Sequence, residues 1–161
     1  MKTLKWISSA LMVTLLMTSC FIDVDDDGGL FNCVDGDGPI ITEEIFLDDF
    51  DGIRIEGEMN VFLKQGPNQE VIVEGKENLI DELERDVNGG IWNIDFDGCV
   101  RDIDEFNIFI TIPDLTVIRI DGSGDVVTEN LFVIEDLEID IEGSGDIDLV
   151  LEADDINTSV E

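Results

Sequence analysis

The sequence contains no histidine and no tyrosine, and it has 8 lysine and arginine residues against 40 aspartate and glutamate residues. Without histidine, Ser123 and Ser144 lack the base that commonly activates a serine nucleophile. Histidine and tyrosine are also common general acids and bases, and both are missing. The shortage of basic residues excludes the phosphate contacts on which DNA and RNA binding depends. We therefore predict no catalytic residue and no nucleic acid partner.

Cysteine is also scarce, with Cys20, Cys33 and Cys99 as the three examples. Cys33 and Cys99 are too far apart for the usual spacing of zinc ligands, so no metal site is expected from them. If Cys20 is modified, the other two form an even pair in an oxidising compartment. This favours a disulfide between Cys33 and Cys99 over two unrelated buried thiols. On the loop-entropy model, the bond would constrain the unfolded chain by roughly 4 kcal/mol.

No apolar run is long enough to cross a membrane as a helix. The run Ile7–Met17 follows two lysines and has the length of a signal-peptide core. It leads into Leu16-Met-Thr-Ser-Cys20, which resembles a bacterial lipobox, with Met17 where leucine is usual. We predict a lipoprotein signal peptide over residues 1–19 and lipidation of Cys20, so that acyl chains would anchor the mature protein in a membrane. The alternative is an ordinary signal peptide with a coincidental cysteine.

Residues 20–40 are rich in aspartate and glycine and are predicted to form an acidic tether. The tether looks like the signal that sends some lipoproteins to the outer leaflet. We therefore expect an outer-membrane lipoprotein at the cell surface, with the periplasmic face as the alternative. Asp23, Asp25 and Asp27 match the start of an EF-hand loop, but the twelfth position is Val34 instead of glutamate, which argues against such a site.

Residues 41–161 are predicted to form one all-β domain, because their acidic residues alternate with isoleucine, valine, leucine and phenylalanine. The strongest strand patterns are Val71–Gly75, Ile91–Phe96 and Phe106–Ile112. One short helix is expected from an N-cap at Asn78 to about Asp86.

A repeat dominates the C-terminal part of the domain. The segment Ile118–Val126 returns roughly 20 residues later as Ile139–Ile147, a third copy begins at Ile156, and Ile53–Val61 looks like an earlier, degenerate copy. Hairpins that turn at Gly-Ser-Gly are one way to fold such a sequence. Repetition by translation instead favours parallel coils, with Ile120, Ile141 and Val160 in one inward stack and Ile118, Ile139 and Thr158 in another.

The Gly-Ser-Gly-Asp segments are predicted to be the corners of these coils, with glycine supplying positive φ and each aspartate capping its own turn. No lysine follows them, so a phosphate-binding loop is not expected. We expect no cofactor, although calcium between Asp125 and Asp146 is the alternative. The corner residues are Gly122, Ser123, Gly124 and Asp125 in one copy, and Gly143, Ser144, Gly145 and Asp146 in the next.

Several segments together resemble the auto-transporter adhesin family, whose unit is the head GIN domain. They are the lipobox, Phe50–Ile53, Val71–Gly75 with Asn78 and Leu79, Pro113–Leu115 and the Gly-Ser-Gly-Asp repeats. The resemblance covers about residues 40–161. It implies a right-handed parallel β-helix (solenoid) on an exported lipoprotein, and it carries no catalytic residues. Family members continue through more coils, so we expect C-terminal coils to be missing here.

The favoured function is a non-catalytic adhesive or structural role at the cell envelope, with a surface glycan or an envelope protein as partner. The alternative is a β-helical polysaccharide hydrolase or lyase with paired carboxylates. Because acidic residues are abundant everywhere, no pair stands out. A third possibility, an apolar ligand among the apolar stacks, is better explained by an ordinary core.

Overall fold

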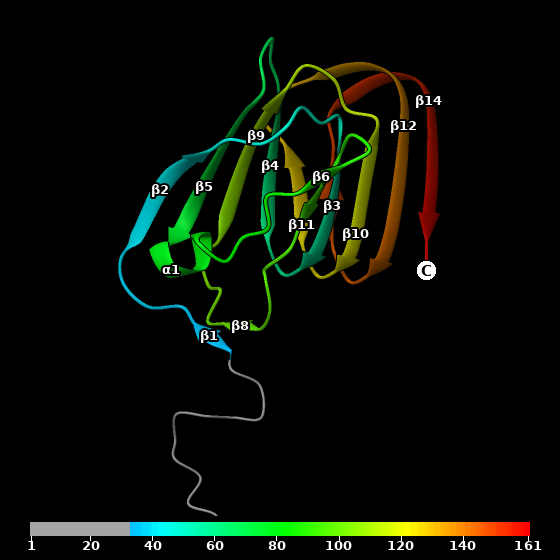
Figure 1. Ribbon diagram of the computed structural model, residues 1–161. Helices are drawn as coiled ribbons and strands as arrows, with labels where there is room; N and C mark the ends of the chain where they lie inside the picture. The colour runs from blue at the N-terminus through cyan, green and yellow to red at the C-terminus, as the bar shows by residue number, and fades with distance from the viewer. Residues whose placement is uncertain (1–32) are drawn as a thin grey trace, which may run out of the picture.

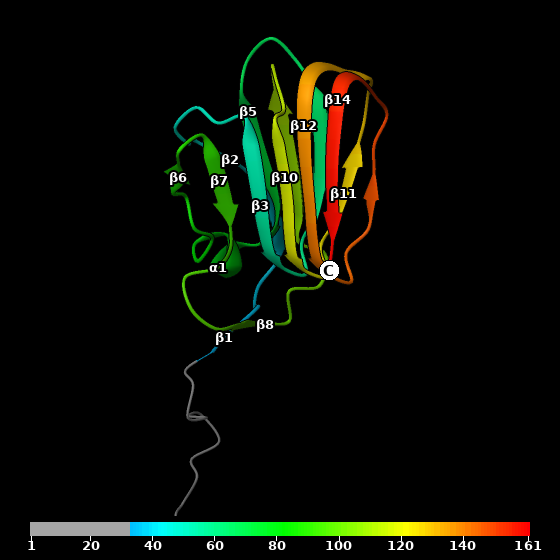
Figure 2. The same cartoon turned by 90° about the vertical axis from the view of Figure 1, so that its right-hand side faces the viewer.

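Apolar and polar residues alternate along most strands, so that each strand turns one row of side chains inward. The computed structural model describes residues 33–161, and most of these strands belong to two six-stranded sheets (Figures 1 and 2). The all-β class is confirmed. Sheet I contains, in spatial order, β14 (Leu151–Val160), β12 (Phe132–Gly143), β10 (Val117–Gly122), β3 (Gly52–Gly57), β7 (Ile91–Ile94) and β6 (Val87–Asn88).

Sheet II lies opposite sheet I. Its strands are β13 (Ile147–Asp148), β11 (Asp125–Thr128), β4 (Asn60–Gln65), β9 (Asn107–Ile112), β5 (Glu70–Lys76) and β2 (Ile40–Ile45). A separate parallel pair joins β1 (Val34–Asp35) to β8 (Val100–Arg101). Figure 2 shows sheet I face on, with β7, β3, β10, β12 and β14 side by side.

The repeats stack in parallel and in register, as the translation of the pattern predicts. Ile120 of β10 lies opposite Ile141 of β12, and Ile141 lies opposite Val160 of β14. On its other side, Ile120 lies opposite Ile55 of β3. The Ile53–Val61 segment is therefore an earlier unit of the same stack, although β5 to β9 lie between it and β10 in the sequence.

Parallel pairing does not extend through the whole domain, so the expectation of a purely parallel β-helix is wrong in the N-terminal half. β5 pairs antiparallel with both β2 and β9, and β6 pairs antiparallel with β7. At the β6–β7 hairpin, Gly89 and Gly90 have φ of 62° and 84°. Two such residues suit a tight hairpin turn, so the Asn88-Gly-Gly segment reverses the chain in addition to interrupting a helix.

The helix is shorter than its sequence pattern predicts. α1 spans Glu77–Ile80, and Lys76 takes the N-cap position expected for Asn78. Leu83, which the pattern places on the helix, instead forms a bridge with Phe96. Pairing with a neighbouring segment and burial of Leu83 in the core outweigh a helical preference that is weak over so few residues.

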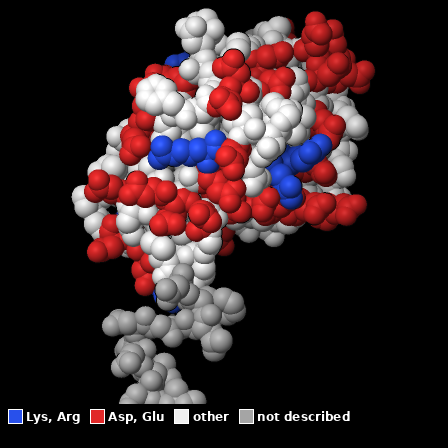
Figure 3. Space-filling view, in the orientation of Figure 1, with Lys and Arg blue, Asp and Glu red and all other residues white. Residues whose placement is uncertain are grey.

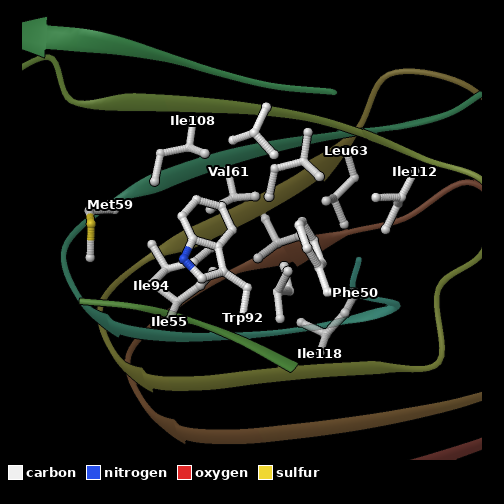
Figure 4. Close-up of a cluster of buried hydrophobic side chains, with 14 of the residues drawn as sticks. Phe50, Ile55, Met59, Val61, Leu63, Trp92, Ile94, Ile108, Ile112 and Ile118 are labelled. Carbon is white, nitrogen blue, oxygen red and sulfur yellow. The ribbon is translucent and has the colours of Figure 1, made fainter. Parts of the chain in front are cut away.

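The core lies between the two sheets (Figure 4). Val61, Leu63 and Ile108 project from sheet II toward Ile55 and Ile94 of sheet I. Phe50 and Trp92 fill the space between them with ring centroids 5.6 Å apart, and the Trp92 indole donates a hydrogen bond of 3.0 Å to the Glu84 carbonyl. These contacts join the two sheets through one shared core and leave each sheet with an outer face. Within residues 33–161, no helix has the length and apolar character needed to cross a membrane.

Candidate functional site

The first glycine of each repeat turn stands directly over the same glycine of the preceding unit. Gly57, Gly122 and Gly143 form one column in register. Gly122 and Gly143 have φ of 154° and 138°, and a Cβ on Gly122 would lie 2.6 Å from the Gly57 carbonyl oxygen. On Gly143, a Cβ would overlap the Gly122 carbonyl oxygen. These positions need glycine because of both backbone conformation and stacking.

The second glycine has a different role from the one predicted. Gly124 does not have a positive φ, but a Cβ there would lie 2.8 Å from the Met59 carbonyl oxygen and 2.9 Å from Ile55 Cγ2. Gly145 repeats the arrangement against the Gly124 carbonyl oxygen. Close packing between units, rather than positive φ, therefore requires the second glycine.

The turn hydrogen bonds run from one unit to the next. The Ser123 amide donates to the Gly57 carbonyl at 2.9 Å, and the Ser144 amide donates to the Gly122 carbonyl at 2.8 Å. We predicted that Asp125 caps its own turn, but its Oδ1 instead accepts the Asp146 amide of the next unit at 3.2 Å. Among residues 33–161, no three acidic or cysteine side chains gather into a metal site. The turns therefore connect neighbouring units.

Cys33 and Cys99 form a disulfide that joins the segments leading into β1 and β8. The Asn78 amide donates to the Asp35 carbonyl at 2.8 Å, and Lys76 Nζ donates to the Gly36 carbonyl at 3.0 Å. The last part of the predicted tether is thus held against the domain from Cys33 onward. Cys20 and the signal peptide lie outside the described residues.

Two arginines occupy the outer face of sheet I, next to each other on β3 and β10. Arg54 contacts Asp121 at 2.5 Å and Glu56 at 3.3 Å, while Arg119 contacts Glu138 at 2.8 Å. The hydrogen bond from Arg54 to Asp121 and the nearby carboxylates raise the pKa of Arg54. Figure 3 shows Lys and Arg side chains as isolated groups on a face with many acidic residues.

A shallow hollow of about 350 Å³ lies beside these arginines. Arg54, Arg119, Glu84 and Asn93 contribute to its lining, and the Asn93 side-chain oxygen is buried without a hydrogen-bond partner. Each arginine is already paired with a carboxylate on its own face, which weakens the attraction of the hollow for an anion.

The outer face of sheet II has a different character. Val127, Phe62, Phe109 and Ile72 are register partners across β11, β4, β9 and β5, and they form an outward row that we call the apolar row. The Phe62 and Phe109 rings stack with centroids 5.0 Å apart and an interplanar angle of 17°.

The sequence did not predict this row, because β4 and β9, which carry the two phenylalanines, look like the continuous apolar runs that are typical of buried strands. The available signal was a second internal match. Asn60-Val-Phe-Leu63 and Asn107-Ile-Phe-Ile110 have the same order of asparagine, aliphatic residue and phenylalanine.

Polar rows flank the apolar row on both sides. Along one side, Asn60 Nδ2 donates to Asn107 Oδ1 at 3.2 Å, and Asn107 Nδ2 donates to Glu74 Oε1 at 3.1 Å. Asp125 of the repeat turn is the register partner of Asn60 and extends this row. On the other side, Lys64, Thr111 and Glu70 form the second row, again as register partners. Sheet II therefore presents a ridge of stacked rings between two hydrogen-bonding rows.

An apolar hollow of about 600 Å³ lies at the β14 end of the sheets, where Ile141, Ile147, Leu149 and Val160 contribute to its lining. These side chains continue the inward stacks of the core. Val160 is 72% exposed and Ile156 is 47% exposed. Within residues 33–161, the hollow therefore lies at the end of the core between the edge strands β13 and β14.

A family model described as "Putative auto-transporter adhesin, head GIN domain" matches residues 49–161. Among solved structures, a putative adhesin from Bacteroides fragilis is similar with a TM-score of 0.73 and 23% identity, over 79% of this chain and 61% of that chain. A putative adhesin from Parabacteroides merdae gives a TM-score of 0.73 and 19% identity, over 79% and 55%.

A putative lipid binding protein from Parabacteroides distasonis gives a TM-score of 0.66 and 22% identity, over 80% of this chain and 62% of that chain. At these identities, the similarity demonstrates a shared fold. The chain spans between 55% and 62% of the length of these three structures. No curated protein matches the chain.

Proposed function

The chain belongs to the auto-transporter adhesin family with a head GIN domain, and from this membership we propose that it is a non-catalytic binding module at the bacterial cell envelope. The observation that carries the proposal is the pair of broad sheet faces. Each presents rows of outward side chains at a regular strand spacing of about 4.8 Å on a rigid core. Such faces suit an extended partner that makes many weak contacts.

The finer part of the proposal is an exported lipoprotein with its Cys20 acylated and its domain on the outer side of the outer membrane. The lipobox and the acidic tether in the sequence support this arrangement. The parallel stack of β3, β10, β12 and β14 supports an interpretation of this region as a β-helix. The partners that we propose are the membrane, through the lipid anchor, and a surface glycan or an envelope protein.

One structural neighbour is called a lipid binding protein, and the apolar hollow at the β14 end is the feature of our chain that could suggest the same role. The hollow lies between two sheet edges that offer backbone hydrogen-bonding groups, which an acyl chain cannot use. Because of these edges, the hollow gives no support for lipid binding.

The test is a comparison of cells that produce the full chain with cells that produce Cys20→Ala or no chain. We expect protease added to intact cells to digest the wild-type protein, and we expect these cells to adhere to surfaces coated with polysaccharide or envelope protein. Cys20→Ala should leave the membrane fraction for the soluble fraction. Protection of the wild-type protein from protease, together with adhesion equal to that of cells without the chain, would contradict the proposal.

A further inference from the structure

The apolar row on sheet II is an exception in a strongly acidic protein. At neighbouring outward positions, this sheet carries asparagine, threonine, lysine and acidic residues, but the row places four apolar side chains on four adjacent strands. At the usual strand spacing, the row is about 14 Å long. It is closed at both ends by carboxylates, since Asp148 is the register partner of Val127 and Glu44 is the register partner of Ile72.

The two phenylalanine rings stack on each other and are only partly buried. Their centroids are 5.0 Å apart, close to the usual strand spacing of about 4.8 Å, and their planes differ by 17°, so the rings stack on each other in the direction that crosses the strands. Phe62 and Phe109 are both half-buried. The row therefore offers a ribbed apolar surface.

The flanking rows offer hydrogen bonds in fixed positions. The hydrogen bonds of Asn60 to Asn107 and of Asn107 to Glu74 hold both amide groups in place. Each of these amides retains a second N–H and unused acceptor capacity. Across the apolar row, Thr111 and Lys64 add a hydroxyl and an ammonium group. A partner lying along the row would meet apolar contacts beneath it and polar groups along both sides.

Charge argues against two possible occupants of the row. Asp125, Glu74, Glu70, Glu44 and Asp148 border the row, with Lys64 as the basic residue among them. An anionic polymer would be repelled, and a second copy of the chain would bring the same acidic border against this one. An uncharged sugar chain avoids this repulsion. Its rings combine an apolar C–H face with hydroxyl groups at the edges, which is the arrangement that the three rows complement.

We infer that the apolar row and its two polar rows bind an uncharged polysaccharide, whose sugar rings pack on Phe62 and Phe109 and whose hydroxyl groups bond to Asn60, Asn107 and Thr111. This inference rests on the proposed function and names the class of partner for one face of the module. The chain of sugars would lie along the row and cross β11, β4, β9 and β5.

The experiment measures binding of the purified full chain to immobilised glucomannan, xyloglucan, mannan and laminarin, with anionic alginate and cationic chitosan oligosaccharides as comparison probes. We expect binding to at least one uncharged polymer, with the same affinity at about 0.1 M and 1 M salt, because screening does not weaken an uncharged contact. No binding to any uncharged polymer would overturn the inference. Binding to alginate or chitosan alone, lost at high salt, would overturn it as well.

Three variants locate the binding face. Phe62→Leu combined with Phe109→Leu keeps the row apolar but removes the rings, and Asn107→Ala removes the central amide. We expect each change to weaken binding about tenfold or more, as for central interface residues. Val133→Ala on β12 of sheet I is the matched control, because it trims an apolar side chain that is 58% exposed without touching the apolar row. It should leave the affinity unchanged.

Thermal unfolding of the same variants separates binding from stability. If the leucine variant unfolds at a lower temperature but binds as well as wild type, the stacked rings only stabilise the sheet and the inference is wrong. If it loses binding to the polymers while cells that carry it still adhere through the chain, the row is the glycan site and adhesion uses a second face. If no uncharged polymer binds but wild-type cells still adhere, the inference fails while the proposed function stands.

Discussion

Replacing Gly122 by alanine should destabilise the protein by about 2–4 kcal/mol, although the change adds a single methyl group on the surface of a turn. Two terms contribute to the loss. The φ of 154° is outside the range that alanine favours, and the new Cβ would lie 2.6 Å from the Gly57 carbonyl oxygen and 2.9 Å from its amide nitrogen. Crowding of a packed backbone typically costs about 1–3 kcal/mol, and backbone strain adds about 1–2 kcal/mol. The reduced entropy of the unfolded chain returns about 0.4–1 kcal/mol.

Two other glycines separate the terms. Gly89 has a φ of 62° with open space around its Cβ position, so Gly89→Ala should show backbone strain alone, about 1 kcal/mol. Gly124 has no positive φ, but its Cβ would lie 2.8 Å from the Met59 carbonyl oxygen, so Gly124→Ala should show crowding alone, about 1–3 kcal/mol.

The assay is urea and thermal unfolding followed by circular dichroism. For a domain of this size, each 1 kcal/mol corresponds to about 3–5 °C in Tm, so Gly122→Ala should lower Tm by roughly 10 °C. Its loss should approximate the combined losses of Gly89→Ala and Gly124→Ala. A loss no greater than that of Gly89→Ala would refute the reasoning, because the column of glycines would then not be in tight contact.

Three further predictions concern covalent, electrostatic and metal effects. Reduction, or Cys33→Ser with Cys99→Ser, should lower the free energy of unfolding by about 2–5 kcal/mol, and equal Tm values with and without reductant would contradict this. Asp121 raises the pKa of Arg54, so the charge of this arginine stabilises the protein fully at any pH below the pKa of Arg54 in the unfolded chain, and this stabilisation is lost only at strongly alkaline pH. The effect of Arg54→Ala on Tm should therefore be the same at about pH 6 and pH 9. A change of this effect with pH would mean that another group is coupled to Arg54. Since the Asp125 Oδ1 already accepts the Asp146 amide, calcium or EDTA should shift Tm by less than about 1 °C, and a larger rise with calcium would support a metal between the turns.

The repeat predicted the best-defined part of the fold. Translation of Ile118–Val126 onto Ile139–Ile147, together with the weaker match at Ile53–Val61, predicted parallel units in register, and this register is confirmed. The prediction works because successive units must bury the same face, which fixes the alternation of side chains and the position of the turn. The family, predicted from the order of short motifs, is also confirmed.

Antiparallel pairing of β5 with β2 and β9 could not be predicted in the same way. These strands do not repeat, and nothing in Val71–Gly75 specifies that β9 rather than β4 lies beside it. The helix end depended on Leu83, whose partner Phe96 lies outside the helical pattern, after the β6–β7 hairpin. Both features are decided by tertiary contacts that local patterns do not contain.

The candidate site was the least predictable part. The repeat turns are the most conspicuous motif of the sequence, yet their glycines allow the backbones of neighbouring units to stack closely. The Phe62 and Phe109 side chains point outward although aliphatic neighbours surround them in the sequence, so the alternation of burial is visible only in the sheet.

The most direct test of this account is a nuclear magnetic resonance titration of the full chain with the uncharged polysaccharide that binds most tightly. It monitors the ring signals of Phe62 and Phe109 and the methyl signals of Val127 and Val133. We predict that the ring signals and those of Val127 shift together with one saturation curve, while Val133 on sheet I does not shift. Shifts at Val133 without shifts of the two rings, or no shifts at any of these positions, would contradict the claim that the outer face of sheet II is the binding surface.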